Sequence, residues 1–335
     1  MSKRIQSFFQ PIPKKPKVEP SSPDPSQPSN ALDIEQEQEE QHEEEQQLPL
    51  THHPAYPFPI PNLPPHLSKA LSNISSTPKP ITNHPHLDLL YFQPLLPPQT
   101  AHYLFHFLRS SLPFYKVQYT IHRGQTPTKI TTPRNTTVFG VDATSTFTHD
   151  EGNKSLLCTK TNTPPPSPRY KCHPRPIPPC LEHLRQTIQS VTNTPPDYYN
   201  FILVNYYASN TDSISYHSDD ERFLGPNPSI ASLSLGAKRD FLLKHKPGIQ
   251  AGPLKFPLAS GDMVVMRGET QANWLHSVPK RAGDGGGRIN VTFRRALVPG
   301  GTENYYRYNV GDGGVWRWDG DRGSMVLVGG EESSG

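Results

Sequence analysis

The sequence predicts an α+β fold with a β-sandwich or jelly-roll core, preceded by a long disordered tail. Three observations support this prediction. The chain has 335 residues, enough for one large domain, yet 40 of them are prolines and only 33% are hydrophobic. The biased composition is concentrated in the first part of the chain. Beyond it, helical periodicity comes first and several short β-rich apolar runs follow.

The tail is expected to span residues 1–83. It holds a Glu/Gln-rich block at 33–47 and then a Pro-rich stretch up to about residue 80. Such compositions cannot bury enough apolar surface to offset the entropy of ordering.

Two short motifs lie near the start of this tail. Ile5, Phe8 and Phe9 are spaced as in the peptide that docks repair and replication proteins onto the sliding clamp. One helical turn would place all three on one side, able to fill a groove. Residues 13–18, PKKPKV, look like a basic nuclear-import signal, so we expect a nuclear protein.

A folded domain is expected over residues 84–299. Its first helix is predicted by apolar residues at helical spacing after Thr100 as an N-cap: Ala101, Leu104, Phe105, Leu108 and Leu112. A second helix is marked by Leu181, Leu184, Ile188 and Val191. The β-rich runs are 201–207, 230–235, 241–243, 263–266 and 289–293, with turn residues between them. Residues 300–335 form a Gly-rich, aromatic extension of unassigned role.

Charge and cysteine content narrow the class of protein. Acidic residues dominate the first 47 residues, so the rest of the chain is basic, which suits a polyanionic partner. None of the three cysteines forms a C-x-x-C pair, which argues against a zinc ribbon or a disulfide framework. The start of the chain lacks the apolar core of a signal peptide, and no apolar run is long enough to span a bilayer. We therefore expect a soluble intracellular protein with no membrane partner.

The segment YHSDDE at 216–221 carries the clearest chemical signal. Side chains at i and i+2 of an extended segment point the same way, so His217 and Asp219 should converge. An imidazole and a carboxylate are two thirds of the 2-His-1-carboxylate triad that holds non-haem Fe(II) and leaves coordination positions open. His276 is the strongest candidate for the third ligand.

A later segment, RINVTFR, predicts a binding site for a dicarboxylate. As a strand it places Arg288, Asn290 and Arg294 on one face and apolar residues on the other. Guanidinium groups on an inward face need anions, and arginine suits bidentate carboxylate binding. Asn205 and Tyr207 repeat the i, i+2 arrangement on an earlier strand, where they could bind the same ligand.

Together these motifs resemble the AlkB family of nucleic-acid demethylases, in order and spacing, from about Pro133 to Arg294. The resemblance implies a double-stranded β-helix core flanked by helices. It implies oxidative dealkylation of N-alkylated bases such as N1-methyladenine and N3-methylcytosine in DNA, as direct repair of alkylation damage. It further implies Fe(II) held by His217, Asp219 and His276, with O2 and 2-oxoglutarate as cosubstrates and the latter anchored by Asn205, Tyr207, Arg288, Asn290 and Arg294.

The resemblance also implies residues that bind the substrate. Arg134 and Phe147 match positions near the nucleotide, with Phe147 stacking on the flipped base. Asp220 and Glu221 follow the metal ligand, and Glu221 is favoured as the reader of the base edge. The hairpin expected within 117–132 carries no bulky aliphatic residue at its tip, where double-strand-repairing members insert a hydrophobic finger. Strand preference therefore stays open.

Three alternatives to DNA repair by a monomeric enzyme remain at this point. The same chemistry could act on RNA, because nothing in the sequence reads a 2′-hydroxyl. It could act on protein side chains or small molecules, which share the metal triad. A non-catalytic clamp-binding adaptor is the third alternative, although an intact triad argues against it.

Overall fold

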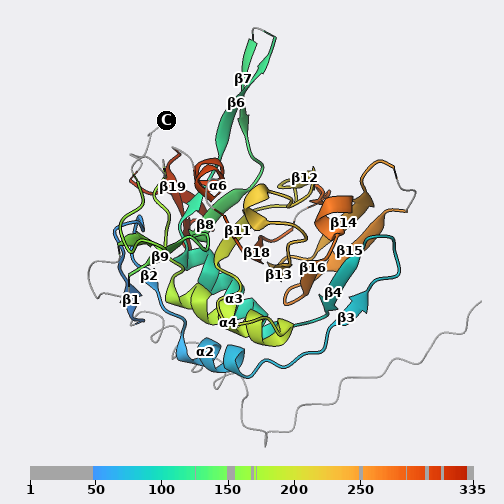
Figure 1. Ribbon diagram of the computed structural model, residues 1–335, viewed down its shortest axis with the longest axis horizontal. Helices are drawn as coiled ribbons and strands as arrows, with labels where there is room; N and C mark the ends of the chain where they lie inside the picture. The colour runs from blue at the N-terminus through green and yellow to red at the C-terminus, as the bar shows by residue number, and fades with distance from the viewer. Residues whose placement is uncertain are drawn as a thin grey trace, which may run out of the picture. The chain divides into compact units, whose positions relative to one another are not determined.

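The computed structural model describes residues 48–124, 126–148, 155–166, 170, 172–248, 252–283, 285–298, 302–310 and 313–329. Two antiparallel sheets form its core (Figure 1). The ten-stranded sheet runs in the order β20 (Ser324–Leu327), β19 (Val315–Asp319), β5 (Phe114–Tyr115), β8 (Asn135–Gly140), β11 (Phe201–Tyr207), β18 (Arg288–Arg294), β13 (Ile230–Gly236), β16 (Met263–Arg267), β4 (Asp88–Phe92) and β3 (Lys79–Ile81). The four-stranded sheet runs β12 (Ile214–His217), β17 (Trp274–Val278), β14 (Arg239–His245) and β15 (Leu254–Leu258).

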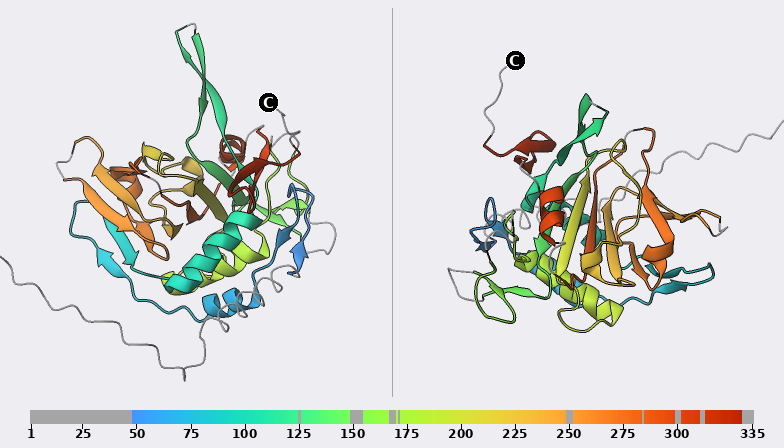
Figure 2. Two further views of the ribbon diagram at one scale, coloured as in Figure 1. Left: turned by 180° about the vertical axis from the view of Figure 1, so that it is seen from behind. Right: turned by 45° about the horizontal axis from the view of Figure 1, so that its top comes forward.

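Helices cover one face of the large sheet, as the two views of Figure 2 show. The long ones are α3 (Pro98–Ser111) and α4 (Pro179–Thr192), with α2 (Pro65–Ser72) packed beside them. Their apolar side chains share a buried cluster with every second residue of the central strands, such as Ile289, Val291 and Phe293 of β18. The alternate residues of these strands face the small sheet, so the space between the two sheets receives their polar side chains.

The jelly-roll expectation is confirmed, and so are both predicted helices and the five predicted strands. The predicted N-cap is wrong, because α3 begins at Pro98 and Thr100 lies inside it. Proline is well suited to the first helical position, where its missing N–H leaves no hydrogen bond unmade. Several short strands, among them β12 and β17, were not predicted.

The expectation of a disordered tail reaching residue 83 is wrong for residues 48–83. This stretch forms β1 (Leu50–Thr51), β2 (Ile60–Pro61), α2 and β3, and it contributes Ile60, Leu67 and Leu71 to the main core. Its prolines occupy extended segments and the start of α2, where they are tolerated. The prediction from composition was wrong because a few widely spaced apolar residues suffice to anchor residues 48–83 on the core, although this stretch is rich in proline.

Two further pieces border the cavity side of the large sheet. The hairpin β6 (Gln118–Arg123) and β7 (Thr126–Thr131) projects from the body as a separate two-stranded ribbon (Figures 1 and 2). The C-terminal extension forms α6 (Thr302–Asn309) and then β19 and β20, which continue the large sheet beyond β5.

Another two-stranded ribbon pairs β9 (Ser145–Phe147) with β10 (Leu156–Cys158). Among the described residues no helix is both long and apolar enough to cross a membrane.

Candidate metal centre and active-site cavity

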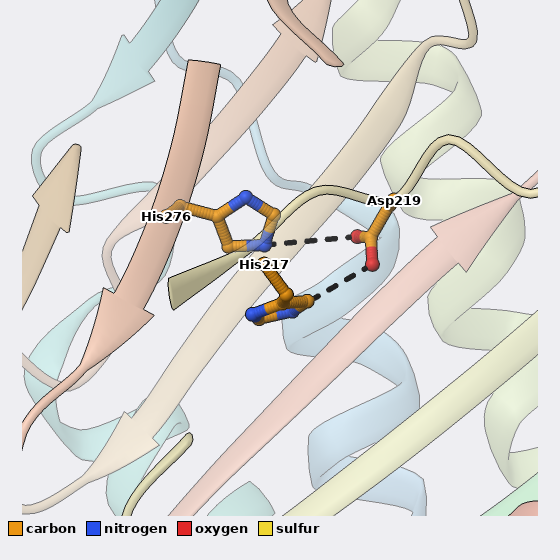
Figure 3. Close-up of side chains that lie close together, drawn as sticks. All are labelled: His217, Asp219 and His276. Carbon is orange, nitrogen blue, oxygen red and sulfur yellow. Dashed lines mark ion pairs between the residues drawn. The ribbon is translucent and has the colours of Figure 1, made fainter. Parts of the chain in front are cut away.

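Figure 3 shows His217, Asp219 and His276 pointing toward one another. His217 ends β12 and is paired with His276 of β17, while Asp219 follows β12 in a loop. The two imidazole Nε2 atoms each lie 3.8 Å from a different Asp219 carboxylate oxygen, and the three ligand atoms lie within 4.8 Å of one another. Separations of this size match three ligands arranged around one metal ion at bond lengths of about 2 Å.

Neighbouring groups orient two of these ligands. His217 Nδ1 lies 2.9 Å from the carbonyl oxygen of Ser215, which places the proton on Nδ1 and leaves Nε2 with its lone pair. The backbone N–H of Asp219 donates to Oε1 of Gln271, at 2.9 Å, and Gln271 is buried in α5 (Thr270–Asn273). This bond holds the Asp219 loop against α5 and so fixes the carboxylate between the two imidazoles.

The protonation states also suit a metal. Burial lowers the pKa of His276 to about 3, although the nearby Asp219 opposes the shift. Burial alone would raise the pKa of Asp219, but Arg294 and the two histidines outweigh it and lower that pKa. At neutral pH His276 is therefore neutral and Asp219 ionised, which are the forms that bind a metal.

The two arginines of β18 are almost fully buried, yet they differ in their partners. Arg294 lies 3.1 Å from Asp219 and donates a hydrogen bond to the hydroxyl of Tyr305. Arg288 donates to Ser234 at 2.8 Å, but its Nε and Nη1 atoms find no hydrogen-bond acceptor among the described residues. Unmade bonds on a buried cation are costly, so an anionic ligand at Arg288 fits the chemistry of the site.

The other predicted ligands of the dicarboxylate lie in the same cavity. Asn205 and Tyr207 of β11 and Asn290 of β18 all line it. Asn290 is held by Ser232 at 2.8 Å, and the Nε atom of Arg134 donates to the Asn205 side-chain oxygen at 2.9 Å. The residues present therefore fit both Fe(II) and 2-oxoglutarate.

The cavity has a volume of about 990 Å³ and opens between the two sheets, beside the hairpin. Glu221 lies in its wall, with one carboxylate oxygen buried and lacking a partner in the described part of the chain. Burial raises the pKa of Glu221 even though Arg294 acts against the shift. The protonated carboxyl that this favours can donate as well as accept a hydrogen bond.

Two predicted substrate residues lie elsewhere. Asp220 is exposed, and its carboxylate pairs with Lys246 at 2.9 Å, outside the cavity wall. Phe147 lies in β9 with its ring against His53, also away from the cavity. The expectations that Asp220 reads a base and that Phe147 stacks on one disagree with these positions. Adjacent residues of an extended segment point to opposite sides, which separates Asp220 from its neighbours. The predicted clamp-binding residues Ile5, Phe8 and Phe9 lie outside the described residues.

Sequence reasoning missed several residues of the site. Tyr305, in the extension after residue 299, contacts Arg294, and burial raises its pKa despite that arginine. Gln271 supports Asp219, as described above. Tyr119 and Tyr308 line the mouth of the cavity. The only available signal was the aromatic cluster after residue 304, because the spacing of isolated polar or aromatic residues does not reveal tertiary contacts.

Comparison with known proteins matches the 2OG-Fe(II) oxygenase superfamily over residues 88–294. The DNA oxidative demethylase ALKBH2 of Homo sapiens is 39% identical over 131 residues, covering 37% of this chain and 49% of that protein. ALKBH2 of Arabidopsis thaliana is 39% identical over 140 residues, covering 36% and 44%. The alpha-ketoglutarate-dependent dioxygenase alkB homolog 3 of Mus musculus is 43% identical over 103 residues, covering 29% and 36%. The chain thus spans about half or less of the length of these relatives.

The matched segment contains the triad, both arginines of β18 and the strands that carry them. The superfamily implies Fe(II), 2-oxoglutarate and O2, and the donor set described above fits the first two. The chain belongs to the 2OG-Fe(II) oxygenase superfamily and is an AlkB-type member of it.

Proposed function

We propose that this chain removes alkyl groups oxidatively from N-alkylated bases in DNA, with N1-methyladenine and N3-methylcytosine as substrates. The observation that carries the proposal is a single cavity lined by the metal triad, by a buried arginine with free donors and by the carboxyl group of Glu221. The relatives named as DNA oxidative demethylases support the choice of substrate.

The residues have separate roles in this proposal. His217, Asp219 and His276 would hold Fe(II), and Arg294 beside Asp219 would bind the end of 2-oxoglutarate nearest the metal. Arg288 would bind the other carboxylate. When bound, Fe(II) together with 2-oxoglutarate and O2 would supply the oxidising chemistry that hydroxylates the N-alkyl carbon. Both arginines are almost fully buried, so water would screen their attraction for the two carboxylates only weakly.

A base has to leave its stack to enter this cavity, at a cost of a few kcal/mol in a duplex. Glu221 would meet the edge of that base: its carboxyl group lines the cavity beside the metal triad, and a carboxyl group can accept from an exocyclic amine or, when protonated, donate to a ring nitrogen. Arg134, at the cavity wall, adds positive charge that suits the polyanionic backbone.

Formaldehyde release tests the proposal. Purified chain with Fe(II), ascorbate and 2-oxoglutarate should release formaldehyde from oligonucleotides containing N1-methyladenine or N3-methylcytosine. His276→Ala should abolish release, and His102→Ala, at an exposed histidine of α3, serves as the control. Turnover of methylated RNA alone would move the substrate to RNA. Turnover of peptides, without turnover of any nucleic acid, would refute the proposal.

We also propose that the N-terminal segment directs the enzyme to replicating DNA in the nucleus. The spacing of Ile5, Phe8 and Phe9 and the basic segment 13–18 support this. A peptide of residues 1–20 should bind the sliding clamp, and Phe8→Ala together with Phe9→Ala should abolish binding. Nuclear accumulation of a tagged chain should be lost when Lys14, Lys15 and Lys17 are replaced by alanine. Unchanged clamp binding or unchanged nuclear accumulation in these variants would refute the respective part.

A further inference from the structure

Exposed apolar side chains gather at one place on the described surface. Seven large hydrophobic residues of the described part are exposed: Leu50, Tyr119, Tyr216, Val298, Tyr308, Leu327 and Val328. Four of them, the three tyrosines and Val298, line the mouth of the active-site cavity. Scattered exposed apolar residues need no explanation, but a cluster beside a cavity indicates a binding surface.

The tyrosines come from three separate parts of the chain. Tyr119 lies at the foot of the projecting hairpin, in β6, and Tyr308 lies in α6 of the C-terminal extension. Their ring centroids are 6.2 Å apart with an interplanar angle of 40°, and their exposed fractions are 40% and 47%. The rings are too close and too tilted to admit another ring between them. A planar ligand would therefore stack on their outward faces.

Tertiary contacts hold the helix that carries Tyr308 in place. The carbonyl oxygen of Asn309 accepts a hydrogen bond from Thr136 of β8, at 2.6 Å, and Tyr305 one turn earlier contacts Arg294 in the cavity. The family match ends at residue 294, so this element lies outside it. The C-terminal extension therefore adds an aromatic side chain to the rim of a cavity that is built mostly from the family-matched segment.

Cations lie beside these rings. The ammonium group of Lys244 lies 4.2 Å from the centroid of the Tyr216 ring, and Arg222, which is exposed, also lines the mouth. Exposed aromatic rings interleaved with cations are the combination by which proteins bind single-stranded nucleic acids, through base stacking and phosphate contacts.

We propose that Tyr119 and Tyr308 form a stacking platform for an unpaired nucleobase that flanks the base in the cavity, with Tyr216 and the nearby cations continuing the track along the strand. A base inside a duplex is already stacked on both faces, so only a single strand offers the platform a free ring. This inference rests on the proposed function for the identity of the ligand. It assigns to the C-terminal extension a part in selecting single-stranded substrate.

Binding of an unmethylated single-stranded octathymidylate, measured by fluorescence anisotropy with the full chain, tests the platform independently of turnover. Tyr308→Ala and Tyr119→Ala should each weaken binding by roughly 5- to 100-fold, the effect of losing one base–aromatic stack. The Phe variants at both positions should bind like the wild type, because the stacking face is retained. Leu50→Ala removes an exposed apolar side chain away from the cavity and should change nothing.

The two tyrosines should also act as one unit, so the double alanine variant should lose less than the sum of the single losses. Affinity for a blunt duplex octamer should be the same in all variants. Unchanged octathymidylate binding in both alanine variants would overturn the proposal and leave the patch to a protein partner. Equal losses for single strand and duplex would overturn the preference for a single strand.

The outcomes separate this inference from the demethylase proposal. Tyrosine-dependent binding by a chain that releases no formaldehyde from any methylated oligonucleotide would support the platform and refute the demethylase. Formaldehyde release with an unchanged KM in the double alanine variant would support the demethylase and refute the platform.

Discussion

Replacing Arg288 with methionine should weaken the binding of 2-oxoglutarate and at the same time stabilise the ligand-free protein. Arg288 is only 2% exposed, and burial lowers its pKa to about 10. Its charge faces Ser234 and the ring of Tyr207, and no carboxylate of the described residues pairs with it. Methionine is an apolar side chain of similar reach, so the substitution removes a buried cation that the ligand-free protein does not neutralise.

The structure sets the expected magnitudes. Replacing buried ionic groups by apolar ones stabilises by about 1–4 kcal/mol in favourable cases. We expect about 1–2 kcal/mol here, because Ser234 loses a donor, and a rise in Tm of about 2–8 °C. Each hydrogen bond to a charged group contributes about 1.5–3 kcal/mol, so the Kd for 2-oxoglutarate should rise roughly 10- to 100-fold.

Calorimetry with and without 2-oxoglutarate measures both effects, because a ligand that binds only the folded state raises Tm. The variant should unfold at a higher temperature than the wild type without ligand and show a smaller ligand-induced rise. Arg294→Met is the matched control. Arg294 lies 3.1 Å from buried Asp219, so its loss should destabilise the protein by about 3–5 kcal/mol. An Arg288→Met variant that is less stable without ligand, or that keeps the full ligand-induced rise, would refute this reasoning.

Three more predictions concern the neighbouring groups. The folded-state pKa of His276, about 3, is below its unfolded value of about 6.5, so the unfolded state binds more protons between these values. The unfolding free energy of the metal-free protein should therefore fall as the pH drops below about 6.5, and it should fall further as Asp219 becomes protonated. In urea titrations at several pH values, the unfolding free energy of His276→Gln should fall less with pH than that of the wild type. Gln271→Ala should weaken Fe(II) binding by roughly 10- to 100-fold in an equilibrium titration, whereas Gln271→Glu keeps the acceptor and should bind Fe(II) more tightly than the alanine variant. Glu221→Gln should raise the KM for methylated oligonucleotide, while Asp220→Asn, which breaks only a surface ion pair, should leave it within about twofold; equal effects would contradict the placement of these carboxylates.

The sequence was most informative where neighbouring residues act together. The period-2 pattern of β18 separates its polar face from its apolar face, and the structure places Arg288 and Arg294 in the cavity and Ile289 and Val291 in the core. The pair His217 and Asp219 was predicted in the same way. Such predictions succeed because side-chain direction along an extended backbone depends only on local geometry.

Contacts between distant segments were decided by the tertiary structure. Gln271 carries no local signal, and the aromatic cluster that contains Tyr305 and Tyr308 does not reveal what they contact. Each of the three reaches the site only because its helix packs against another element. The position of Phe147 was also decided by a distant segment. Phe147 matches a family position, but its ring lies against His53, which belongs to the Pro-rich stretch whose composition had indicated disorder. The sequence by itself predicted the pairing of His217 with Asp219, the polar face of β18 and the fold class, because local periodicity encodes them. The tertiary structure alone decided which side chains complete the cavity, because packing between segments far apart in the chain leaves no pattern in either one.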